Sequence, residues 1–423
     1  MLTSRPDRWI LTMWGRCTEI MLVRVQTILE KALSDCNGIL RLAPCWVARD
    51  LIPPGRRLGL PEDAYDRGER GFVCERWLGS TTHTENRVGP DDEGLSYLVL
   101  DGSPRLTLKH AVEAAPSLIM GNAYAASHSG LGRLAKIFDY GDRLPYHLHL
   151  RASHAALVGR NPKDEAYYYP EGFDLGPHPE IFLGVHPWIV EEGAFEVLLP
   201  YLIEWTSNQI VSHSRAELQV PTEGFEVPSG VLHAPGTAVT IELQEDSDVS
   251  VMLQALNGGR IIPKDRMFKY VRAEDRQRYG ERFILELIDW KANGDPYFYE
   301  NHHLSPRLIK ESYQSGGEEH WVYYNTTKFS GKKLVVRAAS SYRSIDRGAF
   351  NLLVLQGTGL IGKLRVVGGD PTMDELLVSH SAAVAGVDIV NDDPRRDMVV
   401  IKFFGPDVNS DVPMIAQRNE LTH

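Results

Sequence analysis

The sequence has few cysteines, no long apolar run and no low-complexity segment. Its 423 residues include four cysteines, all between Cys17 and Cys74, and none stands in C-x-x-C spacing. Such a set is typical of reduced thiols in a cytosolic protein and does not build a disulfide framework. No apolar run reaches the roughly 20 residues that a membrane-spanning helix needs. These absences argue against a disulfide-rich domain and a helical membrane protein.

The sequence also has fewer basic than acidic residues. The chain has 45 lysines and arginines against 56 aspartates and glutamates, a formal net charge of −11 at pH 7. An acidic chain without a basic block is poorly suited to bind nucleic acid or an anionic membrane. The apolar stretch Trp9–Trp14 is too short for the core of a secretory signal. We therefore expect a soluble, cytoplasmic protein that binds neither nucleic acid nor membrane.

What the sequence does contain is a repeated β pattern. From about Cys45 onward, short apolar or alternating runs are separated by clusters of Gly, Pro, Asp and Asn at spacings of about ten residues. Val239–Leu243, Val249–Leu253 and Leu334–Ala338 are examples. The length allows two or three domains, at about 100–200 residues each. We predict a mainly β fold, a bicupin of two β-sandwich or jelly-roll barrels with a few helices.

Helical patterns are fewer. Near the N-terminus, apolar residues recur at helical spacing, namely Met21, Val25, Ile28, Leu29 and Leu33. Thr107–Ala114 predicts a short helix, and Lys264–Lys291, dense in alternating charge, predicts a longer one. We therefore divide the chain into an N-terminal helical segment over residues 1–37, a β domain over 38–262, a helical connector over 263–295 and a second β domain over 296–423.

Three short motifs suggest a metal site. His147 and His149 would project to one face of a strand, because alternate residues of a strand do so. Imidazole nitrogens bind borderline divalent metals, and a carboxylate such as Glu165 on a neighbouring strand could complete the set. Farther on, the proline and glycine of Pro228–His233 would shape a turn that presents His233 at a strand end. One H-x-H motif alone is compatible with structural histidines, but the three motifs together indicate a metal centre.

These motifs, G-x5-H-x-H, E-x6-G and P-x-G-x2-H, resemble the metal-binding pattern of the cupin barrel. The wider sequence resembles the type I mannose-6-phosphate isomerases, which are zinc-dependent cupins. The most specific matches are V-P-S-G-V-L-H-A at Val227–Ala234 and E-L-Q-E-D-S-D at Glu242–Asp248. Further matches are Ile52–Leu58, Glu75–Trp77, Leu134–Tyr140 and Lys163–Tyr168. The resemblance is clear over residues 40–260 and only general beyond them.

The resemblance implies metal ligands at His149, Glu165 and His233, with His147 at the position where the family has glutamine. Glu180 is a rival carboxylate, because larger family members place theirs in a K-P-E segment. One divalent metal ion is implied, zinc first. Manganese, iron, nickel and cobalt are alternatives, since a set of three histidines and one glutamate also suits them. We expect the first β domain to hold the metal and the second, cupin-like domain to be metal-free.

The chemistry that the resemblance implies is proton transfer between C1 and C2 of a sugar through an enediol. Glu242 is the first candidate for the base, and His147 is the alternative if it does not bind metal. Lys163 would neutralise developing charge or a phosphate. Met252 stands where the family has an active-site arginine, so Arg260 is a candidate to supply that charge. Arg151 and Arg160 are further candidates.

Three classes of function stay open at this point. The first is a metal-dependent aldose–ketose isomerase that acts on mannose 6-phosphate and fructose 6-phosphate or a related sugar. The second is a cupin oxygenase or lyase with a metal held by three histidines and one glutamate. The third is a non-catalytic sugar-binding cupin, which Met252 favours over the first class. We expect a small sugar or sugar phosphate as the partner, with a homodimer as an option.

Overall fold

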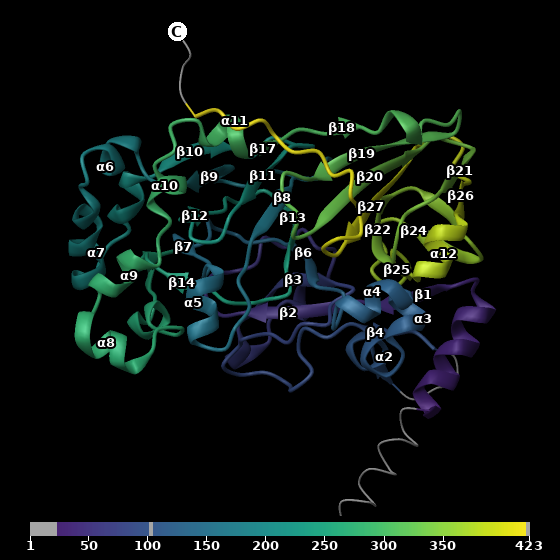
Figure 1. Ribbon diagram of the computed structural model, residues 1–423, viewed down its shortest axis with the longest axis horizontal. Coiled ribbons are helices and arrows are strands. Elements are labelled where there is room, and N and C mark those ends of the chain that lie inside the picture. The colour runs from purple at the N-terminus through teal and green to yellow at the C-terminus, as the bar shows by residue number, and fades with distance from the viewer. Residues whose placement is uncertain (1–22, 101–104, 420–423) are drawn as a thin grey trace, which may run out of the picture.

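The computed structural model describes residues 23–100 and 105–419 and shows a mainly β protein (Figure 1). Within these residues the strands form sheets of nine, seven, five, four and two strands. The expected fold class, mainly β with a few helices, is therefore confirmed. The seven- and five-stranded sheets enclose a polar cavity, and the nine- and four-stranded sheets enclose an apolar core.

The seven-stranded sheet has the order β17-β11-β8-β13-β6-β3-β2. Its strands are β2 (Cys45–Arg49), β3 (Phe72–Leu78), β6 (Arg133–Phe138), β8 (Glu165–Tyr168), β11 (Gly224–Val227), β13 (Thr240–Glu245) and β17 (His303–Leu304). In β13, Glu242 faces the cavity, while Ile241 and Leu243 join an apolar cluster on the opposite face. Alternate side chains of this strand therefore point to opposite faces of the sheet, one toward the cavity and the other toward the apolar core.

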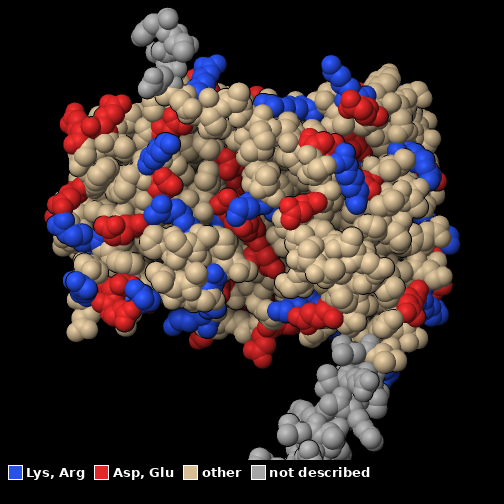
Figure 2. Space-filling model, in the orientation of Figure 1, with Lys and Arg blue, Asp and Glu red and all other residues tan. Residues whose placement is uncertain are grey.

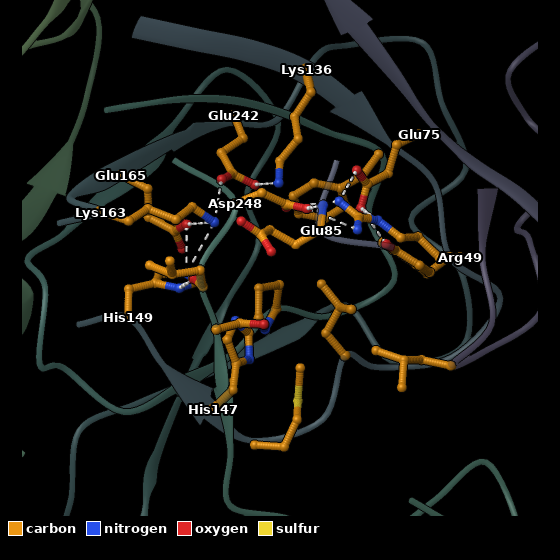
Figure 3. Close-up of a pocket in the computed structure, with 18 of the residues that line it drawn as sticks. Arg49, Glu75, Glu85, Lys136, His147, His149, Lys163, Glu165, Glu242 and Asp248 are labelled. Carbon is orange, nitrogen blue, oxygen red and sulfur yellow. Dashed lines mark hydrogen bonds and ion pairs between the residues drawn. The ribbon is translucent and has the colours of Figure 1, made fainter. Parts of the chain in front are cut away.

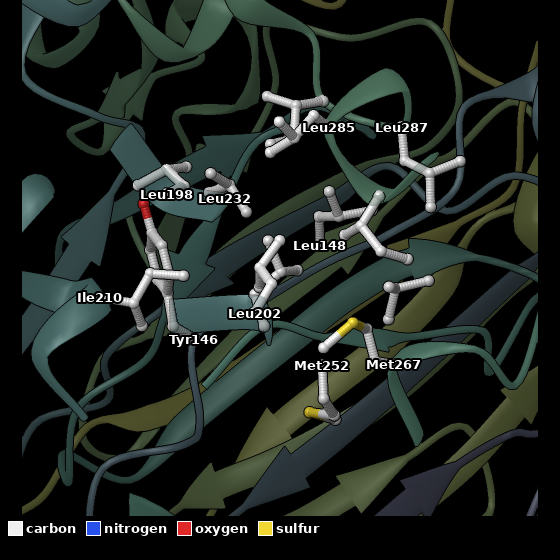
Figure 4. Close-up of a cluster of buried hydrophobic side chains, with 14 of the residues drawn as sticks. Tyr146, Leu148, Leu198, Leu202, Ile210, Leu232, Met252, Met267, Leu285 and Leu287 are labelled. Carbon is white, nitrogen blue, oxygen red and sulfur yellow. The ribbon is translucent and has the colours of Figure 1, made fainter. Parts of the chain in front are cut away.

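The five-stranded sheet, in the order β10-β9-β12-β7-β14, carries the candidate histidines on its inner face. Its strands are β7 (His147–Leu148), β9 (Glu180–Leu183), β10 (Arg215–Leu218), β12 (His233–Ala234) and β14 (Val251–Met252). Leu148, Leu232 and Val251 belong to a large apolar cluster with Leu202 and Leu285, which lie on helices (Figure 4). Helices therefore cover the outer face of this sheet and hold the short strands in place.

The C-terminal block combines two further sheets. The nine-stranded sheet has the order β18-β19-β20-β27-β22-β25-β1-β4-β5, and the four-stranded sheet β21-β26-β23-β24. The strands of the first are β1 (Ile39–Ala43), β4 (Tyr97–Leu98), β5 (Leu106–Thr107), β18 (Arg307–Leu308), β19 (Gly317–Tyr323), β20 (Ser330–Val336), β22 (Phe350–Gln356), β25 (Glu375–Val378) and β27 (Met398–Phe404). Those of the second are β21 (Ser340–Ser344), β23 (Thr358–Ile361), β24 (Leu364–Val367) and β26 (Val387–Asn391).

The two blocks are interlocked rather than joined by one connector. β1 pairs antiparallel with β25, so a strand from the beginning of the chain completes the sheet of the C-terminal block. Ile241 and Leu243 of the seven-stranded sheet share one buried cluster with Tyr323 and Phe403 of the nine-stranded sheet. The Tyr323 hydroxyl also donates a hydrogen bond to the Ile241 carbonyl oxygen at 2.9 Å. The sheets of the two blocks therefore pack face to face.

The helices are short. Residues 23–35 are helical and bury Leu29 against the fold, while Met21 and Trp9–Trp14 lie outside the described residues. The short helix expected over Thr107–Ala114 is α2 (Leu108–Ala114), which Thr107 caps by accepting a hydrogen bond from the His110 amide. The other α-helices after residue 35 in the described part of the chain are α3 (Pro116–Met120), α4 (Asn122–Ser127), α5 (Ala152–Leu157), α6 (Pro187–Glu191), α7 (Leu199–Glu204), α8 (Ala273–Tyr279), α9 (Arg282–Glu286), α10 (Trp290–Asn293), α11 (Phe298–His302) and α12 (His380–Ala385).

One prediction of secondary structure is wrong. Lys264–Lys291, expected as one longer helix, consists of a 3-10 turn, η5 (Lys264–Met267), followed by α8, α9 and the start of α10. Gly280 ends α8 with φ of +55°, a conformation that costs glycine little. Asp289 then starts α10 by accepting a hydrogen bond from the Ala292 amide. These breaks let the segment wrap around the outer face of the five-stranded sheet.

The surface has no extended patch of one charge on the face shown in Figure 2, where acidic and basic side chains are interspersed. A small two-stranded sheet, β15 (Leu256–Asn257) and β16 (Arg260–Ile261), projects beside the site block. In residues 23–100 and 105–419, no helix has the length and apolar character needed to cross a membrane.

Candidate active site

Three histidines meet on the inner face of the five-stranded sheet. His147 of β7 and His233 of β12 are directly opposite each other in the ladder, and their ring centroids are 4.1 Å apart. His149 follows β7, with its ring 5.0 Å from that of His147 and 4.9 Å from that of His233. One ring nitrogen from each histidine lies within 4.8 Å of the other two. The structure thus brings the three sequence-predicted histidines together.

Main-chain carbonyl groups fix the tautomer of each ring. Nδ1 of His147 lies 2.7 Å from the Pro145 oxygen, and Nδ1 of His149 lies 2.7 Å from the Val249 oxygen. Nδ1 of His233 lies 2.9 Å from its acceptor, the Val231 oxygen. A carbonyl oxygen can only accept, so each Nδ1 carries a hydrogen and each Nε2 is the ring nitrogen left to face the cavity. This is the arrangement that orients imidazole ligands in metal sites.

Two of the histidines, His147 and His149, are held neutral by their surroundings. Burial, together with the neighbouring imidazoles, lowers the pKa of His147 well below its usual value. Burial and the adjacent Lys163 ammonium lower the pKa of His149 to about 3. Nε2 of His233 is fully buried and makes no regular hydrogen bond, although a Glu165 oxygen lies 3.0 Å away. Buried polar atoms are rarely left without a hydrogen bond, so this pair of neighbouring atoms fits two ligands of one metal ion.

Glu165 completes the group from the facing sheet. One of its carboxylate oxygens lies 2.9 Å from Nε2 of His149, and the other lies 3.0 Å from Nε2 of His233. Tyr167 donates a hydrogen bond to Glu165 from the same strand, β8. Burial alone would raise the pKa of Glu165, but Lys163 and the histidines outweigh it and hold the pKa well below its usual value. Three imidazoles and one carboxylate suit a single divalent metal ion.

Two lysines and a second glutamate lie beside this group (Figure 3). Lys163 contacts Glu165 at 2.9 Å and Glu242 at 3.2 Å. Lys136, opposite Glu242 in the β6–β13 ladder, contacts the other Glu242 oxygen at 3.2 Å. Burial and the nearby Glu165 charge raise the pKa of Glu242 to about 7, against the opposing pull of the two lysines. A carboxyl group with such a pKa can both accept and return a proton near neutrality.

The other end of the cavity is built from β2, β3 and the turn after β13. Arg49 contacts Glu75 at 3.0 Å and Asp248 at 2.9 Å. Tyr140 donates a hydrogen bond to Glu75 at 2.5 Å. Glu75 belongs to the E-x-W motif, and Asp248 closes the E-L-Q-E-D-S-D motif, so two motifs that carried the family resemblance meet at one wall.

Some sequence-predicted residues do not join the site. Arg260, predicted to supply charge in the active site, lies on the exposed strand β16 and does not line the cavity. The rival carboxylate Glu180 pairs with Arg143 instead of approaching the histidines. Arg151 contacts Asp289 at 3.8 Å, and Arg160 contacts Glu85 at 3.3 Å, both outside the histidine group. Sequence spacing gave no side-chain direction for these residues, so it could not indicate which of them line the cavity.

Other residues of the cavity were not singled out from the sequence. Lys136 is 5% exposed in β6, where Leu134–Phe138 is otherwise apolar, and a lysine within that apolar run was the available signal. Arg49 also lines the cavity, as do Arg266 and Lys269, which lie more than 200 residues farther along the chain. Met252, already noted at the position of the family's arginine, stands opposite His147 in the β7–β14 ladder and lines the same cavity.

Comparison with known proteins gives structural matches only. No protein-family model and no curated protein sequence matches the chain. The mannose 6-phosphate isomerase from Bacillus subtilis aligns with a TM-score of 0.59 at 15% identity, over 86% of this chain and 99% of that one. A point mutant of phosphomannose isomerase from Salmonella typhimurium aligns at 0.58 and 11% identity, over 87% and 100%. A zinc-bound mannose 6-phosphate isomerase aligns at 0.58 and 12% identity, over 87% and 100%.

At such identities the likeness shows a shared fold. Fold and site together define a class: a β protein that holds a buried cluster of three histidines between two sheets, at the base of a charged cavity. More particularly, the chain has the fold of the mannose-phosphate isomerases, over nearly their whole length.

Proposed function

We propose that the protein is a metal-dependent aldose–ketose isomerase that acts on a sugar or sugar phosphate, as the named activity of its structural neighbours suggests. The observation that carries the proposal is the convergence of three imidazoles and Glu165 beside a second carboxyl group, Glu242, in one cavity. Isomerisation needs an electrophile to polarise a carbonyl group and a base to move a proton between adjacent carbons. The cavity offers candidates for both.

In this proposal His147, His149, His233 and Glu165 hold one divalent metal ion, with zinc as the first candidate because a structural neighbour binds it. The fit rests on the Nδ1 hydrogen bonds, which turn each Nε2 inward, and on Nε2 of His233, which makes no regular hydrogen bond and lies 3.0 Å from Glu165. When bound, the metal would act as a Lewis acid toward oxygens of the sugar.

Glu242 is the base in this proposal. Its carboxyl group faces the cavity between Lys136 and Lys163, so either lysine can compensate the charge that changes when it gains or loses a proton. It would take the proton from one carbon of the C1–C2 pair and return it to the other. Lys163, held between Glu165 and Glu242, would donate hydrogen bonds to an oxygen that gains negative charge. Its rigid contacts orient it for that task.

The test is elemental analysis of the purified protein followed by sugar assays. We expect about one divalent metal ion per chain and interconversion of at least one aldose–ketose pair among mannose 6-phosphate, mannose, fructose and lyxose. Metal-loaded protein that isomerises none of these sugars would rule the proposal out. Bound iron or manganese with oxygen uptake would instead favour the oxygenase alternative, which the same ligand set supports.

A further inference from the structure

The cavity has two chemically different ends. Figure 3 shows His147, His149, Lys163 and Glu165 on one side and Arg49 with Glu75 on the other. In the proposed function the reacting carbons bind at the histidine end. The rest of the sugar would extend toward the end formed by Arg49, Glu75 and Asp248, which we call the distal end. A phosphate group on the last carbon would need cationic donors there.

Arg49, the buried cation of the distal end, has no donor left for such a group. Its Nε donates to Glu75 at 3.0 Å, and one terminal nitrogen donates to Glu75 at 3.0 Å and Asp248 at 2.9 Å. The other terminal nitrogen donates to Asn86 at 3.1 Å and to Asp248 at 3.2 Å. A guanidinium group has five N–H donors, so all of them are engaged.

The other cations of the cavity are also paired with carboxylates. Lys136 and Lys163 both contact Glu242 at 3.2 Å. Arg266 donates from one nitrogen to both oxygens of Asp50, at 2.8 and 2.6 Å. Lys269 donates to the main-chain oxygen of Glu85 at 2.7 Å and lies 3.9 Å from its carboxylate.

The cavity is lined by as many acidic as cationic residues. The cationic residues are Arg49, Lys136, Lys163, Arg266 and Lys269, and the acidic residues are Glu75, Glu85, Glu165, Glu242 and Asp248. A metal held by the histidines would add positive charge at the histidine end, not at the distal end. There, a phosphate dianion would meet the carboxylates of Glu75 and Asp248. Sugar hydroxyl groups, by contrast, can donate hydrogen bonds to those same oxygens.

We propose that the substrate is an unphosphorylated aldose or ketose, which the carboxylates of the distal end bind through its hydroxyl groups. This inference rests on the proposed isomerase function for the same cavity. In this inference the paired charges of Arg49, Glu75 and Asp248 determine substrate specificity, because they exclude a sugar with a terminal phosphate.

Kinetics and binding on metal-loaded protein test the inference together. We expect kcat/KM for mannose or fructose to exceed that for the matching 6-phosphate by at least tenfold. By calorimetry, mannitol should bind more tightly than mannitol 1-phosphate. A 6-phosphate that is turned over better than the free sugar overturns the inference but leaves the isomerase proposal standing. If no sugar is turned over but mannitol still binds more tightly than mannitol 1-phosphate, the isomerase proposal is overturned. The inference that the cavity prefers unphosphorylated ligands then still stands. Binding of neither polyol overturns the inference.

An Asp50→Asn variant sharpens the test, because it releases Arg266 from its carboxylate partner without altering the distal wall. We expect the ratio of kcat/KM for the 6-phosphate to that for the free sugar to rise at least threefold. Asp63→Asn, which removes an exposed carboxylate of the same loop region, is the matched control and should leave the ratio unchanged. An unchanged ratio in Asp50→Asn would contradict the proposal that charge pairing excludes phosphate.

Discussion

The C-terminal block buries charges between its two sheets just as the site block does, but it closes them into a complete network. Lys402 of β27 is 0% exposed and contacts Glu319 at 2.5 Å and Asp346 at 2.8 Å. Lys332, directly opposite Lys402 in the β20–β27 ladder, contacts Asp346 at 2.7 Å and Glu319 at 3.6 Å. Ser344 accepts a further hydrogen bond from Lys402 at 2.5 Å. Each lysine thus touches both carboxylates.

The site block satisfies its buried polar atoms less completely. Nε2 of His233 and one carboxylate oxygen of Glu242 make no regular hydrogen bond, although Glu165 lies 3.0 Å from the first and Lys163 lies 3.2 Å from the second. Buried charges that are fully paired can hold a fold together, while buried atoms with unused bonding capacity indicate a place for a ligand. The comparison therefore separates a structural network from a functional one within the same kind of sheet pair. Substitutions in the two networks should have different consequences.

Removal of a histidine should have the largest effect. His233→Ala deletes one proposed ligand, so we expect metal content to fall below a tenth of the wild-type value and isomerisation to be lost. The measurement is elemental analysis combined with the sugar assay. His178→Ala, which removes a half-exposed histidine outside the cavity, is the control and should change neither. Full metal occupancy in His233→Ala would show that the ligand assignment is wrong.

Lys402→Met should mainly affect folding. It strips two buried carboxylates of a partner, and breaking a buried ion pair on one side costs about 3–5 kcal/mol of unfolding free energy. Urea denaturation measures this change. Metal bound per folded molecule should stay at the wild-type level, because the network lies in the other block. Lys310→Met, at an exposed lysine, is the matched control. A folded Lys402→Met protein that loses its metal would contradict the separation of the two networks.

Glu242→Gln should leave the fold and metal content intact and reduce kcat at least 100-fold, because general-base catalysis typically contributes a factor of about 10²–10⁴. Glu180→Gln is the isosteric control and should change kcat less than twofold. Arg260→Ala should behave like this control, since Arg260 lies outside the cavity. A Glu242→Gln enzyme with wild-type kcat would remove Glu242 from the mechanism.

Acid should weaken the C-terminal network by a smaller, graded amount. Burial alone would raise the pKa of Asp346, but Lys402 and Lys332 outweigh it and hold the pKa below its usual value. The unfolded chain therefore binds the proton more readily, and the stabilisation present at neutral pH is lost as the pH falls below about 4. The difference in unfolding free energy between wild type and Asp346→Asn should shrink there by at most about 1.4 kcal/mol per pH unit. A constant difference from pH 7 to pH 3 would argue against a depressed pKa.

Local patterns in the sequence predicted much of the fold and the core of the site. The alternation in Val239–Leu243 predicted a strand, and the H-x-H spacing predicted that His147 and His149 share a face. Pairing between distant segments could not be read in this way. The addition of β1 to the sheet beside β25 depends on contacts across more than 300 residues, for which a single sequence carries no local signal.

The distal end of the cavity was beyond prediction for the same reason. Arg49 and Asp248 are separated by 199 residues, and neither has a periodic or spaced motif that points to the other. Lys136 resembled any other strand lysine until its position opposite Glu242 was known. Side-chain direction relative to a cavity is a property of the assembled sheets.

The central claim is that His147, His149, His233 and Glu165 bind one metal ion. Anomalous diffraction from crystals of the metal-loaded protein, recorded at the absorption edge of the metal found by elemental analysis, tests it most directly. We predict one strong peak, bounded by the Nε2 atoms of the three histidines and a carboxylate oxygen of Glu165. A strong peak elsewhere, or none in protein shown to be metal-loaded, would contradict the claim.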